Sequence, residues 1–188
     1  MPRSRLRRWA LLAVLAAVPL AAVPDARAQA PTTISADPAD VGSVDAILKS
    51  LYDVISGPAG QKRNWDRMRS LFVEGARLIP TGQRADGTRV MRMLTVEEYI
   101  AGSGPILERD GFFEREIGRT TEQFGQIVHV FSAYDSKRLP TDPAPFARGI
   151  NSIQLRHDGT RWWVVTIFWD SERADNPIPA KYLGGGGR

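Results

Sequence analysis

The sequence predicts an α+β domain in which helices from the first half of the chain pack against a long antiparallel sheet from the second half. Between residues 44 and 107, apolar side chains recur with the spacing of a helix face, whereas alternating or continuous apolar runs typical of strands extend from 112 to 169. Asp158-Gly159 separates the last two runs and is typical of a hairpin turn. We find no internal repeat, and the length suits one domain.

Residues 1–28 have the three parts of a secretory signal peptide: a start with four arginines, the apolar run Trp9–Val23, and overlapping Ala-x-Ala sites at 26–30. A membrane anchor is the alternative, but this run contains a proline and a spanning helix needs about 20 apolar residues. We therefore expect cleavage, an exported protein (periplasmic or secreted), and no membrane association afterwards. Arg7-Arg8 leaves the choice between Sec and twin-arginine export open.

The net charge of the chain belongs to this N-terminal segment. The whole chain has a formal charge of +4, but without residues 1–28 it has 20 basic and 20 acidic side chains. Nucleic-acid binding calls for a basic face, which this balance does not favour. The chain has no cysteine, which excludes disulfides and thiolate ligands.

Residues 29–42 are rich in Ala, Pro, Thr and Asp without periodicity, and we expect a flexible leader there. The domain is expected to span 43–172. Ser43 is the predicted N-cap of a first helix, which ends before Gly57-Pro58. A second helix is expected from Asn64 to Gly75.

Two short strands, Ala76–Pro80 and Arg89–Leu94, are expected next. Thr95 followed by Glu98 forms a capping-box pattern that predicts a third helix, made irregular in its middle by glycines and Pro105.

The remainder of the domain is predicted to form four long strands: Phe112–Thr121, Gly125–Ser136, Gly149–Leu155 and Arg161–Trp169. The last of these is apolar on both faces, which indicates that both faces are covered. A second subunit could cover one face, so we expect a homodimer. Residues 173–188 are predicted to be an extended C-terminal tail.

This order of elements resembles the nuclear transport factor 2-like superfamily, and in particular its exported bacterial SnoaL-like members. The segments LYDVISGPAG, NWDRMRSLF, ARLIP, RGINSIQL and RWWVVTIFW carry the resemblance, which covers about residues 43–172. It implies a cone-shaped, curved antiparallel sheet wrapped round three N-terminal helices, with an interior cavity and often a dimer through the outer face. The superfamily includes isomerases, dehydratases, cyclases, hydrolases, transport factors and ligand-binding proteins, so the resemblance does not name a reaction.

Acid–base chemistry inside a cone needs a titratable group with a shifted pKa and a hydrogen-bond donor opposite it. The candidate catalytic residues are Tyr52, His129 and Asp170. In the superfamily's steroid isomerases a first-helix tyrosine and a cavity aspartate do this work. Tyr52 corresponds roughly to that tyrosine, but the strand Ala76–Pro80 contains no aspartate, which counts against isomerase chemistry.

Further titratable candidates are Tyr99, Tyr134, Glu114 and Glu116. The two glutamates alternate with Phe113, Arg115 and Ile117, so we expect them on a solvated strand face.

The predicted ligand pocket combines aromatic side chains with polar residues of the fifth predicted strand. It consists of Tyr52, Trp65, Phe72, Tyr99, Phe113, Ser152, Gln154 and Trp169. We expect no metal site, because the chain has two distant histidines and no cysteine. Glycine patterns that bind nucleotide phosphates are absent too, so no cofactor is expected.

Three functions follow from these patterns. The first is an exported cone that binds a small, mostly apolar molecule without a recognisable catalytic motif. The second is an acid–base enzyme of the isomerase, dehydratase or cyclase type, which requires a titratable residue deep in the cone beside Tyr52 or Tyr99. The third is a dimeric interaction domain that uses the outer sheet face.

Overall fold

The computed structural model describes residues 34–183 of the chain. The predicted signal peptide and the export that follows from it lie outside the described residues, as do the start of the leader and the end of the tail. Within residues 34–183, no helix is both long and apolar enough to cross a membrane.

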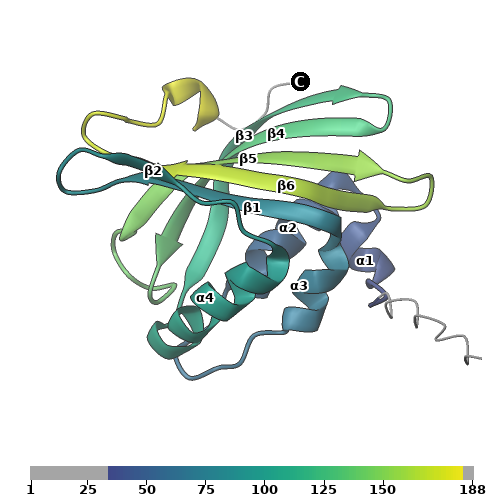
Figure 1. Ribbon diagram of the computed structural model, residues 1–188, viewed down its shortest axis with the longest axis horizontal. Coiled ribbons are helices and arrows are strands. Elements are labelled where there is room, and N and C mark those ends of the chain that lie inside the picture. The colour runs from purple at the N-terminus through teal and green to yellow at the C-terminus, as the bar shows by residue number, and fades with distance from the viewer. Residues whose placement is uncertain (1–33, 184–188) are drawn as a thin grey trace, which may run out of the picture. The chain divides into compact units, whose positions relative to one another are not determined.

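The described residues form one curved six-stranded sheet whose concave face holds helices (Figure 1). The helices are α1 (Pro38–Val41), α2 (Val44–Ile55), α3 (Trp65–Leu71) and α4 (Val96–Asp110). The strands are β1 (Phe72–Gln83), β2 (Arg89–Met91), β3 (Phe113–Phe124), β4 (Ile127–Lys137), β5 (Ala147–His157) and β6 (Trp162–Ser171), in the spatial order β2-β1-β6-β5-β4-β3. This architecture confirms the predicted α+β cone.

The sheet is mixed, whereas we expected it to be antiparallel throughout. β1 pairs parallel with β6, starting from Phe72 opposite Val164, and every other pairing is antiparallel. The reason is the position of α3, which leads the chain directly into β1 at the end of the sheet where β6 also begins.

Most predicted helix boundaries are confirmed by cap hydrogen bonds. Ser43 accepts from the amide of Ala46, and the capping box of Thr95 and Glu98 is complete in both directions. The second helix is shorter than expected: it ends at Leu71, and Gly75 lies within β1. Gly75 adopts φ 77° where the β1–β6 register shifts, so its left-handed conformation forms a strand irregularity instead of a helix end.

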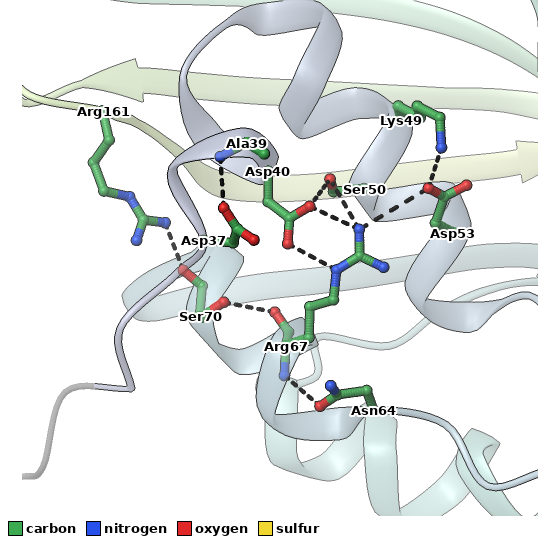
Figure 2. Close-up of polar contacts among 10 residues, drawn as sticks. All are labelled: Asp37, Ala39, Asp40, Lys49, Ser50, Asp53, Asn64, Arg67, Ser70 and Arg161. Atoms are coloured by element: carbon green, nitrogen blue, oxygen red, sulfur yellow. Dashed lines mark hydrogen bonds and ion pairs between the residues drawn. The ribbon is translucent and has the colours of Figure 1, made fainter.

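The part of the predicted leader nearest the domain is ordered and forms α1 (Figure 2). The Arg67 guanidinium donates to both carboxylate oxygens of Asp40, at 2.7 Å each, and the Ser50 hydroxyl donates to Asp40 at 2.9 Å. The side chain of Val41 is buried in the same core as α2. The folded domain therefore begins before Ser43, and α1 is joined to both α2 and α3.

A bulge in β6 determines which side chains face the helices. The register between β5 and β6 shifts between Gln154 and Leu155, so that Leu155 pairs with Val164 and Gln154 with Thr166. Regular alternation would place Val164 and Ile167 on opposite faces, but the extra residue brings both to the concave side. This is how a strand with apolar residues at nearly every position contributes to one core.

The C-terminal segment folds back over the outer, convex face of the sheet, on the side opposite the helices (Figure 1). Ile178 is buried there, and the ring of Tyr182, in the short helix η1 (Ala180–Tyr182), lies 5.1 Å from the ring of Phe131. The backbone of Tyr182 approaches Gly118 of β3 so closely that a Cβ there would collide with it. The predicted tail thus covers part of the outer face.

Candidate functional site

A cavity of about 280 Å³ lies between the helices and the concave face of the sheet. This volume is just below the usual range of small-molecule pockets, about 300–1,000 Å³. Four of the predicted pocket residues line it: Tyr52 from α2, Phe72 from β1, Tyr99 from α4 and Trp169 from β6. Three further aromatic side chains of the lining were not among the predicted pocket residues: Phe112, Phe146 and Tyr134, the last of which was predicted only as a titratable candidate.

One carboxyl group, that of Glu114, lies in this mostly apolar lining. The Ser136 hydroxyl donates to one of its oxygens at 2.9 Å, and the Asn151 amide approaches the other at 3.5 Å. The amide of Glu114 donates to the Ser56 hydroxyl, at 3.0 Å, which fixes the start of β3 against the end of α2. Strands β3, β4 and β5 and helix α2 together hold this carboxyl group in the cavity.

A chain of hydrogen bonds continues from Glu114 to a second carboxyl group. The Asn151 amide donates to the Tyr52 hydroxyl at 3.2 Å, and that hydroxyl lies 2.7 Å from the Ser132 hydroxyl. Ser132 donates to Glu116 at 3.1 Å. Tyr52 is therefore placed in the middle of a polar network that is buried at Tyr52, Ser132 and Asn151 and has a partly buried carboxyl group at each end.

Burial shifts the titration of these groups. Removal from water raises the pKa of Glu114 to about 7, because the hydrogen bonds from Ser136 and Asn151 offset only part of the cost of a buried charge. Burial likewise raises the pKa of Tyr134 to about 12 and that of Tyr52 still further, and the negative charge of Glu114 acts in the same direction on both. Near neutral pH the Tyr52 and Tyr134 hydroxyls are therefore protonated and neutral, and the Glu114 carboxyl group is close to the midpoint of its titration.

The expectation that Glu114 and Glu116 form a solvated strand face is wrong for Glu114, which lines the cavity. Glu116 is partly buried and belongs to the same hydrogen-bond network. The face was misjudged because Phe113 was placed inside, whereas its neighbour Phe112 lines the cavity. Side chains two apart share a face in a strand, so Phe112 and Glu114 point to the same side.

The remaining predicted pocket residues lie elsewhere. The Trp65 ring packs beneath Gly104 of α4 and donates to Glu108 at 2.9 Å. Ser152 lies on the outer face of the sheet. Gln154 lies on the outer face too, because side chains alternate along a strand and its neighbour Ile153 lines the cavity. Asn151, which the sequence reasoning did not choose, supplies the polar contact from β5.

Two of the three predicted catalytic residues are outside the cavity. The ring of His129 lies 3.1 Å from the Ser152 hydroxyl on the outer face. Asp170 accepts two hydrogen bonds from Arg173, at 2.7 and 3.1 Å, and this pairing lowers its pKa. Only Tyr52 contributes to the interior network. Residues 34–183 contain no group of three His, Cys, Asp or Glu side chains that could hold a metal ion.

Among known proteins, the chain is similar to several solved structures. No family model and no curated protein matches the chain. The Kfla4162 protein of Kribbella flavida is 8% identical with a TM-score of 0.52, over 70% of this chain and 90% of that one. An NTF-2 like protein of unknown function from Silicibacter pomeroyi is 12% identical with a TM-score of 0.46, over 70% and 94%. A protein of unknown function with a cystatin-like fold from Nostoc punctiforme is 13% identical with a TM-score of 0.44, over 59% and 78%.

At such identities structural likeness describes the fold and not the activity. The order of helices and strands, and the curved sheet that holds the helices on its concave face, are those that the sequence resemblance implied. Residues 34–183 thus have the α+β cone fold that the resemblance to the nuclear transport factor 2-like superfamily implied.

Proposed function

We propose that the protein binds a small, mostly apolar molecule in the cavity of the cone. The observation that carries this proposal is a cavity of about 280 Å³ whose lining is mainly aromatic and aliphatic, with its polar groups gathered around Glu114 and Tyr52. Apolar walls with a few convergent polar groups are the usual composition of a small-molecule site.

A pair of bulky substitutions on α4 tests this proposal. Ser103 lines the cavity, whereas Ala101 on the same helix is exposed. We expect Ser103→Phe to fill the cavity and to abolish the binding of small apolar molecules, and Ala101→Phe to leave it unchanged. Quenching of tryptophan fluorescence is a suitable measurement, because Trp169 lines the cavity. Equal binding by both variants would place the ligand outside the cone.

Proton transfer is a second candidate function, and the position of Glu114 favours it. A general base works best when its pKa is near the working pH, and burial raises the pKa of Glu114 to about 7. An acid–base function also needs a titratable group in the cone beside Tyr52. Glu114 is such a group, because the Asn151 amide links it to the Tyr52 hydroxyl.

Exchange of the α-hydrogens of a small cyclic ketone in D2O, followed by NMR, tests the second candidate. We expect Glu114 to accelerate this exchange and Glu114→Gln to lower the rate at least about a hundredfold, the usual contribution of general base catalysis. If the wild-type protein gives no acceleration over buffer, binding without catalysis is the better description.

Export and self-association complete the proposal and come from the sequence alone. N-terminal sequencing of the protein recovered from the periplasm or the medium should give a chain that begins near residue 29. A homodimer through the outer sheet face is the expected assembly, which light scattering of residues 29–188 can measure.

A further inference from the structure

We propose that the ligand is a small organic ammonium: an apolar body with one positively charged nitrogen that pairs with Glu114 among the aromatic rings of the cavity. This inference rests on the proposed binding function and names the chemical class of the ligand. It begins from the absence of a counter-charge: among the described residues that line the cavity, none is lysine, arginine or histidine.

A buried carboxylate is costly unless it is paired with a positive charge. The groups that donate to Glu114, the Ser136 hydroxyl and the Asn151 amide, are neutral. The two arginines of the same strand pair with other carboxyl groups: Arg115 donates to Asp135 at 2.9 Å, and Arg119 pairs with Asp45 and Glu116. A ligand with an ammonium group would supply the charge that the protein does not.

The other charged and titratable groups around Glu114 also favour a cation. Glu116 lies at the far end of the hydrogen-bond network, and the negative charge of Asp135 raises the pKa of Glu114. Tyr52 from α2, Tyr99 from α4 and Tyr134 from β4 have raised pKa values and stay neutral over the physiological range. The potential inside the cavity is therefore negative once Glu114 ionises.

The aromatic rings add a second attraction for a cation. Tyr99 and Trp169 line the cavity with ring centroids 6.3 Å apart, edge to face, and Tyr134 is near enough for the charge of Glu114 to raise its pKa. The face of an aromatic ring attracts an ammonium group within about 6 Å. A carboxylate and several rings in one small cavity together form a site for an organic cation, and the apolar walls accommodate its hydrocarbon part.

A matched pair of probes tests the charge directly. 2-Phenylethylamine and 2-phenylethanol have the same carbon skeleton, but only the amine is a cation near neutral pH. By isothermal titration calorimetry at pH 8, we expect the amine to bind at least about tenfold more tightly than the alcohol. This preference should decrease at pH 6, because protonated Glu114 cannot pair with the cation. It should disappear in Glu114→Gln and persist in Glu122→Gln, which changes an exposed carboxyl group of the same strand.

The outcomes separate this inference from the function on which it rests. Equal binding of the two probes, or tighter binding of the alcohol, would overturn the ammonium inference and leave small-molecule binding in place. If neither probe binds, and Ser103→Phe and wild-type protein behave alike towards apolar dyes, both proposals are overturned. Circular dichroism of Glu114→Gln checks that the variant is folded.

Discussion

Glu114 couples the stability of the fold to pH. In the unfolded chain a glutamate titrates near its ordinary value, whereas burial raises the pKa of folded Glu114 to about 7. The folded state therefore holds this proton more strongly than the unfolded state. Its stabilising effect is complete below the unfolded pKa and is lost as the pH rises through the folded pKa, in a window from about pH 4.5 to 7.

The variant Glu114→Gln should remove this dependence. We expect it to become more stable relative to the wild-type protein as the pH rises, by about 2–3 kcal/mol between pH 4.5 and 8. Urea unfolding at several pH values measures this difference. Glu122→Gln, on the same strand but exposed, is the control and should show no such trend. A difference that is constant with pH would mean that Glu114 titrates as it does in water.

The residues that the sequence placed on the wrong face of the sheet lie in strands where a shift of one residue decides which side chains point inward. Phe112 and Phe113 are both apolar, so the inward-facing series that runs into β3 could start at either residue. In the structure it starts at Phe112, just before β3, and therefore includes Glu114. On β5 the sequence did offer a signal: Asn151 shares its face with Ile153 and Leu155, both fully buried. The more apolar face should have been assigned to the core, which would have identified Asn151 in place of Ser152.

At the scale of elements, α1 is held by a partly buried ion pair. Asp40 receives both hydrogen bonds of the Arg67 fork, and the contact with Arg67 holds the pKa of Asp40 below its ordinary value. The stabilisation is therefore present above the unfolded pKa, near 4, and is lost as the pH falls through the lower folded pKa.

Asp40→Ala tests whether α1 is an integral part of the domain. We expect a loss of about 1–3 kcal/mol in the free energy of unfolding at pH 7, because the change leaves Arg67 and Ser50 without their shared partner. The loss should shrink below pH 4. Glu74→Ala removes an exposed carboxyl group for comparison and should cost less than about 0.5 kcal/mol. If both variants cost the same, the contacts of Asp40 with Arg67 and Ser50 add nothing to stability.

Helices were predictable from the sequence because their signals are local. Ser43, Asn64 and Thr95 each accept the cap hydrogen bond that their residue type favours. The β6 bulge and the parallel pairing of β1 with β6 depend on contacts between distant segments, which a single sequence does not reveal. α1 was missed for the same reason, since its main partner Arg67 lies 27 residues away.

At the scale of the whole molecule, the outer sheet face is shared between the C-terminal segment and open surface. A pocket of about 470 Å³ lies between that segment and strands β4, β5 and β6. Phe168, on the same face, remains 42% exposed. The apolar face predicted from β6 therefore exists, but the chain itself covers part of the surface on which a second subunit was expected to pack.

Deletion of residues 177–188 should uncover this face. Loss of Ile178 and Tyr182 would expose the side chains against which they pack, Phe131 among them. We expect the fluorescence of the dye 8-anilinonaphthalene-1-sulfonate to increase about twofold or more, and self-association to increase with it, because a contiguous apolar patch promotes both. Deletion of residues 184–188 alone retains Ile178 and Tyr182 and serves as the control. Sedimentation velocity separates two arrangements of the dimer. If the full chain is a dimer and the longer deletion leaves it a dimer, the interface uses the open surface around Phe168. If the full chain is a monomer that dimerises only after the deletion, the C-terminal segment occupies the dimer face. Unchanged dye binding and unchanged association in the longer deletion would contradict the covering role of the segment.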